Sequence, residues 1–204
     1  MNPIVAAAMQ AGALQKADEL EELYPHVAKL APKSIIEIGC DAGGTLKYWT
    51  SFTPDVLGID LPTGNWGTPR PLVTHGATVI LGNSHNNVVA DMATAWVARY
   101  PTTTIKRDPN ILGQPYYCDL LFIDGDHTYD GVKKDYEWYG DLVRPGGMIV
   151  FQDIVEHDRK LHPDVDVHRF WKELSAEFSA ARGERINIVS EDGEAWGGIG
   201  VLWK

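Results

Sequence analysis

The sequence predicts an α/β protein, with a doubly wound, mostly parallel sheet of seven strands and helices on both faces. Short apolar runs alternate along the chain with longer stretches of helical periodicity, as in successive strand–helix–strand units. The run at 118–123 is almost continuously apolar, which is typical of a strand covered on both faces. The predicted strands are residues 35–38, 55–60, 77–81, 118–123, 148–151, 186–190 and 198–203.

Length and composition restrict the class of protein. At 204 residues the chain is long enough for one domain, which we divide into a helical cap at 1–30 and a core at 31–204. The net charge of −10 argues against a nucleic-acid partner, which would require concentrated Lys and Arg. No apolar stretch approaches the length of a membrane span, and no basic leader of a secretory signal is present. We therefore expect a cytoplasmic protein without a membrane partner, in which Cys40 and Cys118 are buried and unpaired.

Residues 3–30 are predicted to be helical, because apolar side chains recur there at helical spacing. The recurring apolar residues are Leu20, Leu23, Val27 and Leu30. The acidic residues Asp18, Glu19, Glu21 and Glu22 are expected on a solvated face. Pro32 then separates this helix from the first strand.

A glycine-punctuated turn, Gly39-x-x-x-Gly43, follows the first predicted strand. Such a strand–loop–helix unit presents backbone N–H groups to a ligand, and glycine permits the close approach. An ordinary tight turn is the alternative for this segment taken alone. A dinucleotide-binding fingerprint requires G-x-G-x-x-G, so an NAD-dependent dehydrogenase is disfavoured. Glu37 stands within the strand end, where a core strand would usually carry an apolar residue.

Polar residues also follow the second, fourth and fifth predicted strands. They are Asp60, Asp124, Asp126, His127, Gln152 and Asp153. Ligands of open α/β sheets bind beyond the carboxyl ends of the strands, so we expect these side chains to converge on one cavity. Asp60 is placed to accept hydrogen bonds from ribose hydroxyls, with a turn-forming role as the alternative.

Helices are further predicted at 45–52, 86–100, 129–143 and from 167 to about 178. In the second of these, an apolar stripe is expected to lie in the core: Val88, Val89, Met92, Trp96 and Tyr100. The long loop at 63–76, with Trp66 and Arg70, is assigned to substrate access. The loop at 155–166 carries His157 and His162, whose irregular spacing favours a solvated segment over a metal site. No chemistry is assigned to the loop at 101–117.

The segment Glu37-x-Gly39-x-x-x-Gly43 resembles the first motif of class I S-adenosylmethionine (SAM)-dependent methyltransferases. The segments 122–127 and 144–153 resemble motifs of small O-methyltransferases, a subgroup that includes metal-dependent catechol-type and macrolide-sugar enzymes. The resemblance covers residues 33–203. It implies a Rossmann-like fold, SAM as the cofactor, and methylation of a small hydroxylated acceptor such as a sugar or natural-product intermediate.

The resemblance also implies roles for individual residues. Those expected to bind the cofactor are Glu37, Gly39, Gly43, Asp60, Asn83, Ser84 and Asp126. For Asn83 and Ser84 a helix N-cap is the alternative, and for Asp126 a contact with the substrate.

The metal and catalytic roles follow from the same resemblance. Asp124 and Asp153 are expected to bind Mg²⁺, with Gln152 supplying a neutral oxygen. Because Gln152 and Ile154 stand where the family often carries an acidic residue or Asn, the need for Mg²⁺ stays open. His127 is expected to act as the catalytic base, with helix capping or an ion pair to a carboxylate as the alternative.

Two other functions are kept as alternatives. On the same fold, Asp124, His127 and Asp153 could form the iron site of a hydroxylase-like enzyme. A non-catalytic nucleotide-binding protein is disfavoured by the intact loop glycines and Asp60. N-terminal helices of small methyltransferases either cap the active site or mediate dimerisation, so a homo-oligomer is one of two expectations for residues 1–30.

Overall fold

The computed structural model describes residues 1–62, 71–99, 117–181, 185–192 and 194–204. Most of the predicted access loop, including Trp66 and Arg70, therefore lies outside the described residues, as does nearly all of the loop predicted at 101–117. Within the described ranges, no helix is both long and apolar enough to cross a membrane.

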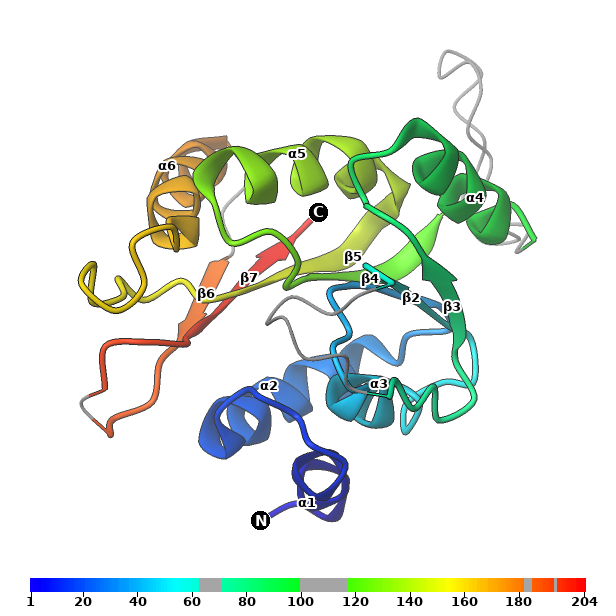
Figure 1. Ribbon diagram of the computed structural model, residues 1–204, viewed down its shortest axis with the longest axis horizontal. Coiled ribbons are helices and arrows are strands. Elements are labelled where there is room, and N and C mark those ends of the chain that lie inside the picture. Colours follow the sequence, from blue (N-terminus) through cyan, green and yellow to red (C-terminus); the bar gives the residue numbers. More distant parts are fainter. Residues whose placement is uncertain (63–70, 100–116, 182–184, 193) are drawn as a thin grey trace.

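One seven-stranded sheet forms the centre of the molecule (Figure 1). Its strands are β1 (Ile35–Ile38), β2 (Val56–Asp60), β3 (Thr78–Leu81), β4 (Cys118–Ile123), β5 (Val143–Gln152), β6 (Arg185–Ile188) and β7 (Ile199–Trp203). They lie in the order β3-β2-β1-β4-β5-β7-β6. The first five run parallel, whereas β7 pairs antiparallel with both β5 and β6. The predicted fold class is confirmed.

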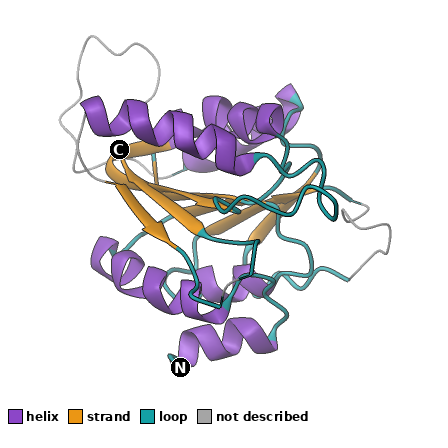
Figure 2. Cartoon of the chain, turned by 90° about the vertical axis from the view of Figure 1, so that its left-hand side faces the viewer, coloured by secondary structure: helices purple, strands orange, loops and turns teal. Residues whose placement is uncertain are grey.

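Helices cover both faces of this sheet (Figures 1 and 2). One layer consists of α4 (Asn87–Val97), α5 (Tyr129–Tyr139) and α6 (Val167–Ala181), and the other of α1 (Pro3–Gln10), α2 (Ala17–Leu30) and α3 (Gly44–Trp49). Alternate strand residues supply the two cores, since neighbouring side chains of a strand point to opposite faces. Leu121 and Ile123 of β4 pack in the core under α4–α6, whereas Leu120 and Phe122 pack in the core under α1–α3. All six residues of β4 are buried, as the apolar run predicted.

The N-terminal stretch forms two helices rather than the single helix predicted from its spacing. Residues 11–16 separate α1 from α2, and Gly12 adopts a φ of +93°, which ends regular helix. This connection packs closely on the start of α3, where a Cβ at Gly44 would lie 2.0 Å from the backbone nitrogen of Ala13. The break therefore brings residues 12–15 toward the glycine loop after β1. The division into a cap at 1–30 and a core at 31–204 stays a prediction.

The predicted solvent exposure of the acidic residues on α2 is wrong for Glu19. Glu19 is only 1% exposed and accepts hydrogen bonds from the backbone N–H groups of Gly198 (2.9 Å) and Ser190 (3.3 Å). Spacing could not reveal this contact, because it joins the N-terminal helix to the connection between β6 and β7. Glu22, by contrast, is exposed as expected.

Helix α4 buries a narrower face than the predicted stripe. Val89 and Trp96 are buried as expected, together with Ala93 and Val97, at the i, i+4, i+7 and i+8 spacing of one helix face. Val88 and Met92 are 64% and 49% exposed, because each precedes a buried position and points outward. Tyr100 lies outside the described residues.

The end of α5 also differs from the prediction. The helix ends at Tyr139, a short 3₁₀ turn, η1 (Gly140–Leu142), follows, and β5 already begins at Val143. Residues 144–147 thus belong to an irregular start of β5, where the register against β4 shifts between Cys118 and Leu120. Cys40 and Cys118 are buried and unpaired, as predicted.

Candidate functional site

The carboxyl ends of the parallel strands surround a cavity of about 330 Å³. Strand-end residues that line it are Gly39, Asp60, Asp124, His127, Gln152 and Asp153. The expected convergence on one cavity is confirmed for every predicted strand-end side chain except Asp126, which does not line this cavity. Their roles are a separate matter and depend on the contacts that each makes.

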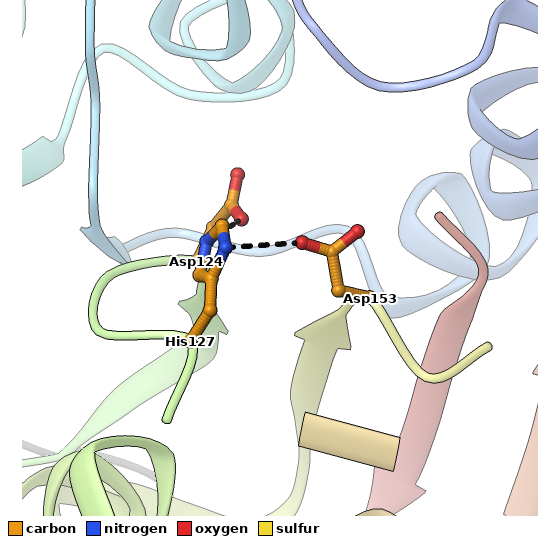
Figure 3. A group of neighbouring side chains, drawn as sticks. All are labelled: Asp124, His127 and Asp153. Atoms are coloured by element: carbon orange, nitrogen blue, oxygen red, sulfur yellow. Dashed lines mark ion pairs between the residues drawn. The ribbon is translucent and has the colours of Figure 1, made fainter. Parts of the chain in front are cut away.

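Three of these side chains form a compact group (Figure 3). The imidazole of His127 lies between two carboxylates, with Nε2 3.3 Å from Asp124 Oδ1 and Nδ1 3.3 Å from Asp153 Oδ2. Donor atoms of all three residues lie within 4.8 Å of one another. Asp124 follows β4, His127 precedes α5, and Asp153 follows β5. Two turns at one sheet edge, one between β4 and α5 and one after β5, therefore meet in one charged cluster.

Local backbone interactions hold this cluster in place. Asp153 adopts a φ of +64°, a left-handed conformation that Asp tolerates better than most residues. The next two residues are held by the connection between β6 and β7. The N–H group of Ile154 donates to the Gly198 carbonyl, and that of Val155 donates to the Gly197 carbonyl. The carbonyl of His127 accepts a hydrogen bond from the Asp166 N–H, and Thr128 is the N-cap of α5. His127 is thus not the helix cap; it makes the ion pairs that were the other alternative.

Sequence reasoning missed Gln15 and misjudged His157. The side-chain N–H of Gln15 donates to Asp124 Oδ2 at 2.7 Å. His157 is buried rather than solvated, with Nε2 3.5 Å from Asp153 Oδ1 and Nδ1 3.0 Å from the Val155 carbonyl. Both residues line the first cavity. In the sequence, only Gly12 indicates that the chain could turn near Gln15. No spacing pattern predicts the contact between His157 and Asp153.

Burial and charge set the protonation of the cluster. Burial raises the pKa of Asp124 to about 6, although His127 opposes the shift. Burial alone would lower the pKa of His127, but the facing carboxylates of Asp124 and Asp153 outweigh it and raise that pKa to about 9. Burial would raise the pKa of Asp153, but the histidines beside it outweigh burial and lower it. At neutral pH the imidazole is therefore protonated while both carboxylates face it.

Glu37 does not line this cavity. It is fully buried in β1, and its carboxylate makes no hydrogen bond of good geometry to any described residue. Burial raises its pKa to about 8, although Thr45 and Trp49 beside it lower the value. The group is consequently uncharged at neutral pH.

The glycine loop is fixed from two sides. Asp60 Oδ2 accepts hydrogen bonds from the backbone N–H groups of Cys40 (2.8 Å) and Asp41 (2.6 Å). Gly39 has a φ of +86°, and a Cβ there would lie 1.9 Å from the Asp124 carbonyl oxygen. A side chain at Gly39 would thus first meet the backbone after β4. Gly43 does not line this cavity, and a Cβ there would lie 2.0 Å from the Val73 carbonyl oxygen.

A second cavity of about 340 Å³ adjoins the first, and both are lined by Gly39, Asp60 and His127. Three further predicted residues line only this second cavity: Asn83, Ser84 and Asp126. Asn86 is the N-cap of α4, so neither Asn83 nor Ser84 has that role. The predicted cofactor residues, other than Glu37 and Gly43, therefore lie in the walls of two adjoining cavities.

The donor set at the cluster fits a hard divalent cation such as Mg²⁺. Asp124 and Asp153 supply carboxylate oxygens, the ligands that such ions prefer. Gln152 is 4% exposed, and its side-chain oxygen Oε1 has no hydrogen-bond partner among the described residues. An unpartnered buried acceptor beside two carboxylates is suited to a bound cation.

A sequence profile of the family described as "Methyltransferase domain" matches residues 36–154, which is more than half of the chain. Among curated proteins, an uncharacterized protein of Acanthamoeba polyphaga mimivirus is 46% identical over 43 residues. That match covers 21% of this chain and 20% of the viral protein, so the chain matches only a fifth of this relative.

Solved structures share the fold at low sequence identity. MycE, a methyltransferase of the mycinamycin biosynthetic pathway solved with Mg, S-adenosylhomocysteine (SAH) and mycinamycin VI, gives a TM-score of 0.60 at 16% identity. The comparison covers 100% of this chain and 55% of MycE. TomG, an O-methyltransferase from Streptomyces achromogenes solved with SAM, gives 0.56 at 16% identity, covering 100% of this chain and 91% of TomG. At such identities the likeness concerns the fold alone.

Proposed function

The chain belongs to the methyltransferase-domain family, and from that premise we propose that it transfers a methyl group from SAM to a hydroxyl group of a small molecule. The observation that carries this proposal is the pair of adjoining cavities, which share Gly39, Asp60 and His127 in their walls. The two cavities would take the nucleoside of SAM and the acceptor, with the amino-acid tail of SAM against the glycine loop. MycE and TomG, which share the fold, were solved with SAH and SAM respectively.

In this proposal the second cavity holds the nucleoside. Asp60 would accept a hydrogen bond from a ribose hydroxyl through Oδ1, which accepts one N–H group, that of Leu61, whereas Oδ2 already accepts two, those of Cys40 and Asp41. Asn83, Ser84 and Asp126 would line the base and ribose region. The amino-acid end would lie against the backbone of the glycine loop.

The first cavity would hold the acceptor. Asp124, Asp153 and Gln152 would hold a divalent cation, which supplies Lewis-acid activation of a bound hydroxyl group. In the transfer, the acceptor oxygen forms a bond to the methyl carbon while the carbon–sulfur bond breaks and SAH leaves. The protein positions the two reactants for in-line attack.

His127 would take the hydroxyl proton. Its pKa of about 9 reflects two carboxylates that face the imidazolium. Carboxylates engaged by a cation attract the imidazolium less, so the pKa of His127 would fall toward the range in which a neutral imidazole accepts a proton. Asp124 and Asp153 would then orient the ring and stabilise the proton once transferred.

Calorimetric titration with SAM, with and without Mg²⁺, tests the cofactor, and methyl transfer to a panel of hydroxylated small molecules tests the reaction. We expect His127→Ala to lower kcat by about 10²- to 10⁴-fold while SAM still binds. His26→Ala is the control, since His26 lies on α2 and lines neither cavity. A folded protein without affinity for SAM would contradict the proposal.

An iron-dependent hydroxylase-like enzyme is the second candidate. It is favoured by one observation, that two carboxylates and an imidazole present donor atoms within 4.8 Å, which is also a donor set for iron. Iron-dependent consumption of oxygen without SAM affinity would favour it. A cytoplasmic location and a homo-oligomeric state stay predictions.

A further inference from the structure

The segment between α1 and α2 brings a polar side chain into the first cavity from a part of the chain outside the strand ends. Gln15 is 4% exposed and lines the cavity. Its Nε2 donates to Asp124 Oδ2 at 2.7 Å, across 109 positions of the sequence. The opposite end of the amide, Oε1, is buried and has no hydrogen-bond partner among the described residues.

An unpartnered amide oxygen is costly inside a protein, because it loses its hydrogen bonds to water without replacement. The neighbouring Lys16 donates no hydrogen bond to this oxygen. Lys16 pairs with Asp192 at 2.8 Å, and its ammonium group lies 4.5 Å from the centre of the Trp196 ring. The same cavity holds a second orphan acceptor of the same kind, Oε1 of Gln152.

The position of Gln15 is fixed on both sides. Toward the N-terminus, Ala13 packs on the backbone of Gly44. Toward the C-terminus, Lys16 is tied to the connection between β6 and β7. A side chain held this firmly beside Asp124 is preorganised for a ligand, since little conformational entropy remains to be lost on binding.

We propose that Gln15 is a direct ligand-binding residue of the cation site, in which its Oε1 joins the oxygens of Asp124, Asp153 and Gln152 around a divalent cation. This deepens the proposed function and rests on its cation site. It makes the N-terminal segment part of the catalytic centre rather than only a cover over it. The chemistry is that of a hard cation, which accepts neutral amide oxygens together with carboxylates.

The test is binding of Mn²⁺, followed by the electron paramagnetic resonance signal of the free ion, in the presence of saturating SAH. Gln15→Met keeps the length of the side chain and removes the oxygen. We expect it to raise the Kd for Mn²⁺ by about 10- to 100-fold, the usual cost of losing a group that supports a metal site. Gln10→Met, on the exposed end of α1, is the matched control and should leave the Kd unchanged.

Gln15→Glu separates a direct ligand from a residue that only orients Asp124. A carboxylate at this position repels Asp124 but adds a charged ligand, so a direct role predicts a lower Kd for Mn²⁺ than in the wild type. A weaker affinity in both Gln15 variants would overturn the direct role, as would an unchanged Kd in Gln15→Met. Absence of Mn²⁺ binding by the wild type would also overturn it. Calorimetry with SAH reports on the proposed function independently of all three results.

Discussion

At the scale of single residues, Glu37 shows how strongly the fold can change the chemistry of a side chain. It stands in the middle of the sheet, between β2 and β4, where its neighbours are Gly58 and Phe122. Burial raises its pKa from 4.5 to about 8, so it carries a proton under conditions in which the unfolded chain would not. Asp124 and Asp60 nearby raise this pKa further.

Glu37 should therefore make stability depend on pH. Between pH 4.5 and 8 the folded state keeps a proton that the unfolded state has lost, so the free energy of unfolding falls as pH rises. The contribution is a loss of roughly 1.4 kcal/mol per pH unit within that window, and it levels off above about pH 8. In Glu37→Gln this component should be absent. Urea unfolding at several pH values measures it.

Glu22→Gln serves as the control for that experiment, because Glu22 is exposed on α2. Its pH profile should follow that of the wild type. A Glu37→Gln profile parallel to the wild type across the same window would mean that Glu37 does not hold a proton in the folded state.

At the scale of elements, α2 and the connection between β6 and β7 are joined by a group of polar contacts. Glu19 accepts hydrogen bonds from the N–H groups of Gly198 and Ser190, and Lys16 forms an ion pair with Asp192. The same connection presents its carbonyls to the residues after Asp153. The two ends of the chain thus support one wall of the first cavity.

Removing the Glu19 carboxylate should weaken the contact between α2 and the β6–β7 connection and lower the free energy of unfolding. Glu19→Ala leaves the buried N–H of Gly198 without its acceptor, which typically costs about 1–3 kcal/mol of unfolding free energy. Glu22→Ala, on the exposed side of the same helix, should change stability far less. Equal urea midpoints for the two variants would show that the Glu19 contacts contribute little.

At the scale of the whole molecule, the two cavities are assembled from segments spread over most of the chain. Their walls include residues from Gly12 before α2 to Trp196 before β7. A ligand that fills them contacts the strand ends, the start of α3 and the connection between α1 and α2. Such a ligand should bind the folded state and have little affinity for the unfolded chain.

SAH should accordingly stabilise the entire fold. At a concentration of one hundred times its Kd, the linkage relation gives a gain of about 2.7 kcal/mol in the free energy of unfolding. Denaturant unfolding with and without SAH measures this gain, and adenosine alone, which lacks the amino-acid tail, should give less at the same concentration. Tight calorimetric binding without a gain in stability would contradict a site formed only on folding.

The sequence by itself determined the sheet and the edge at which the site lies. Apolar runs such as 118–123 favour burial on both faces of a sheet. This local pattern is enough to predict where the strands lie along the chain. Asp60, Asp124 and Asp153 could be placed near one another because parallel strands end at the same edge. Element ends were less predictable, as the early start of β5 and the break between α1 and α2 illustrate.

Only the tertiary structure decided which side chains surround those carboxylates. Gln15 reaches Asp124, Glu19 reaches Gly198, and His157 turns back to Asp153. The first two contacts join segments more than 100 positions apart, and the third depends on a left-handed turn at Asp153. Periodicity reports which face of an element is apolar, but it contains no information about which distant segment packs there. Burial follows from that packing, and burial in turn raises the pKa values of Glu37 and Asp124.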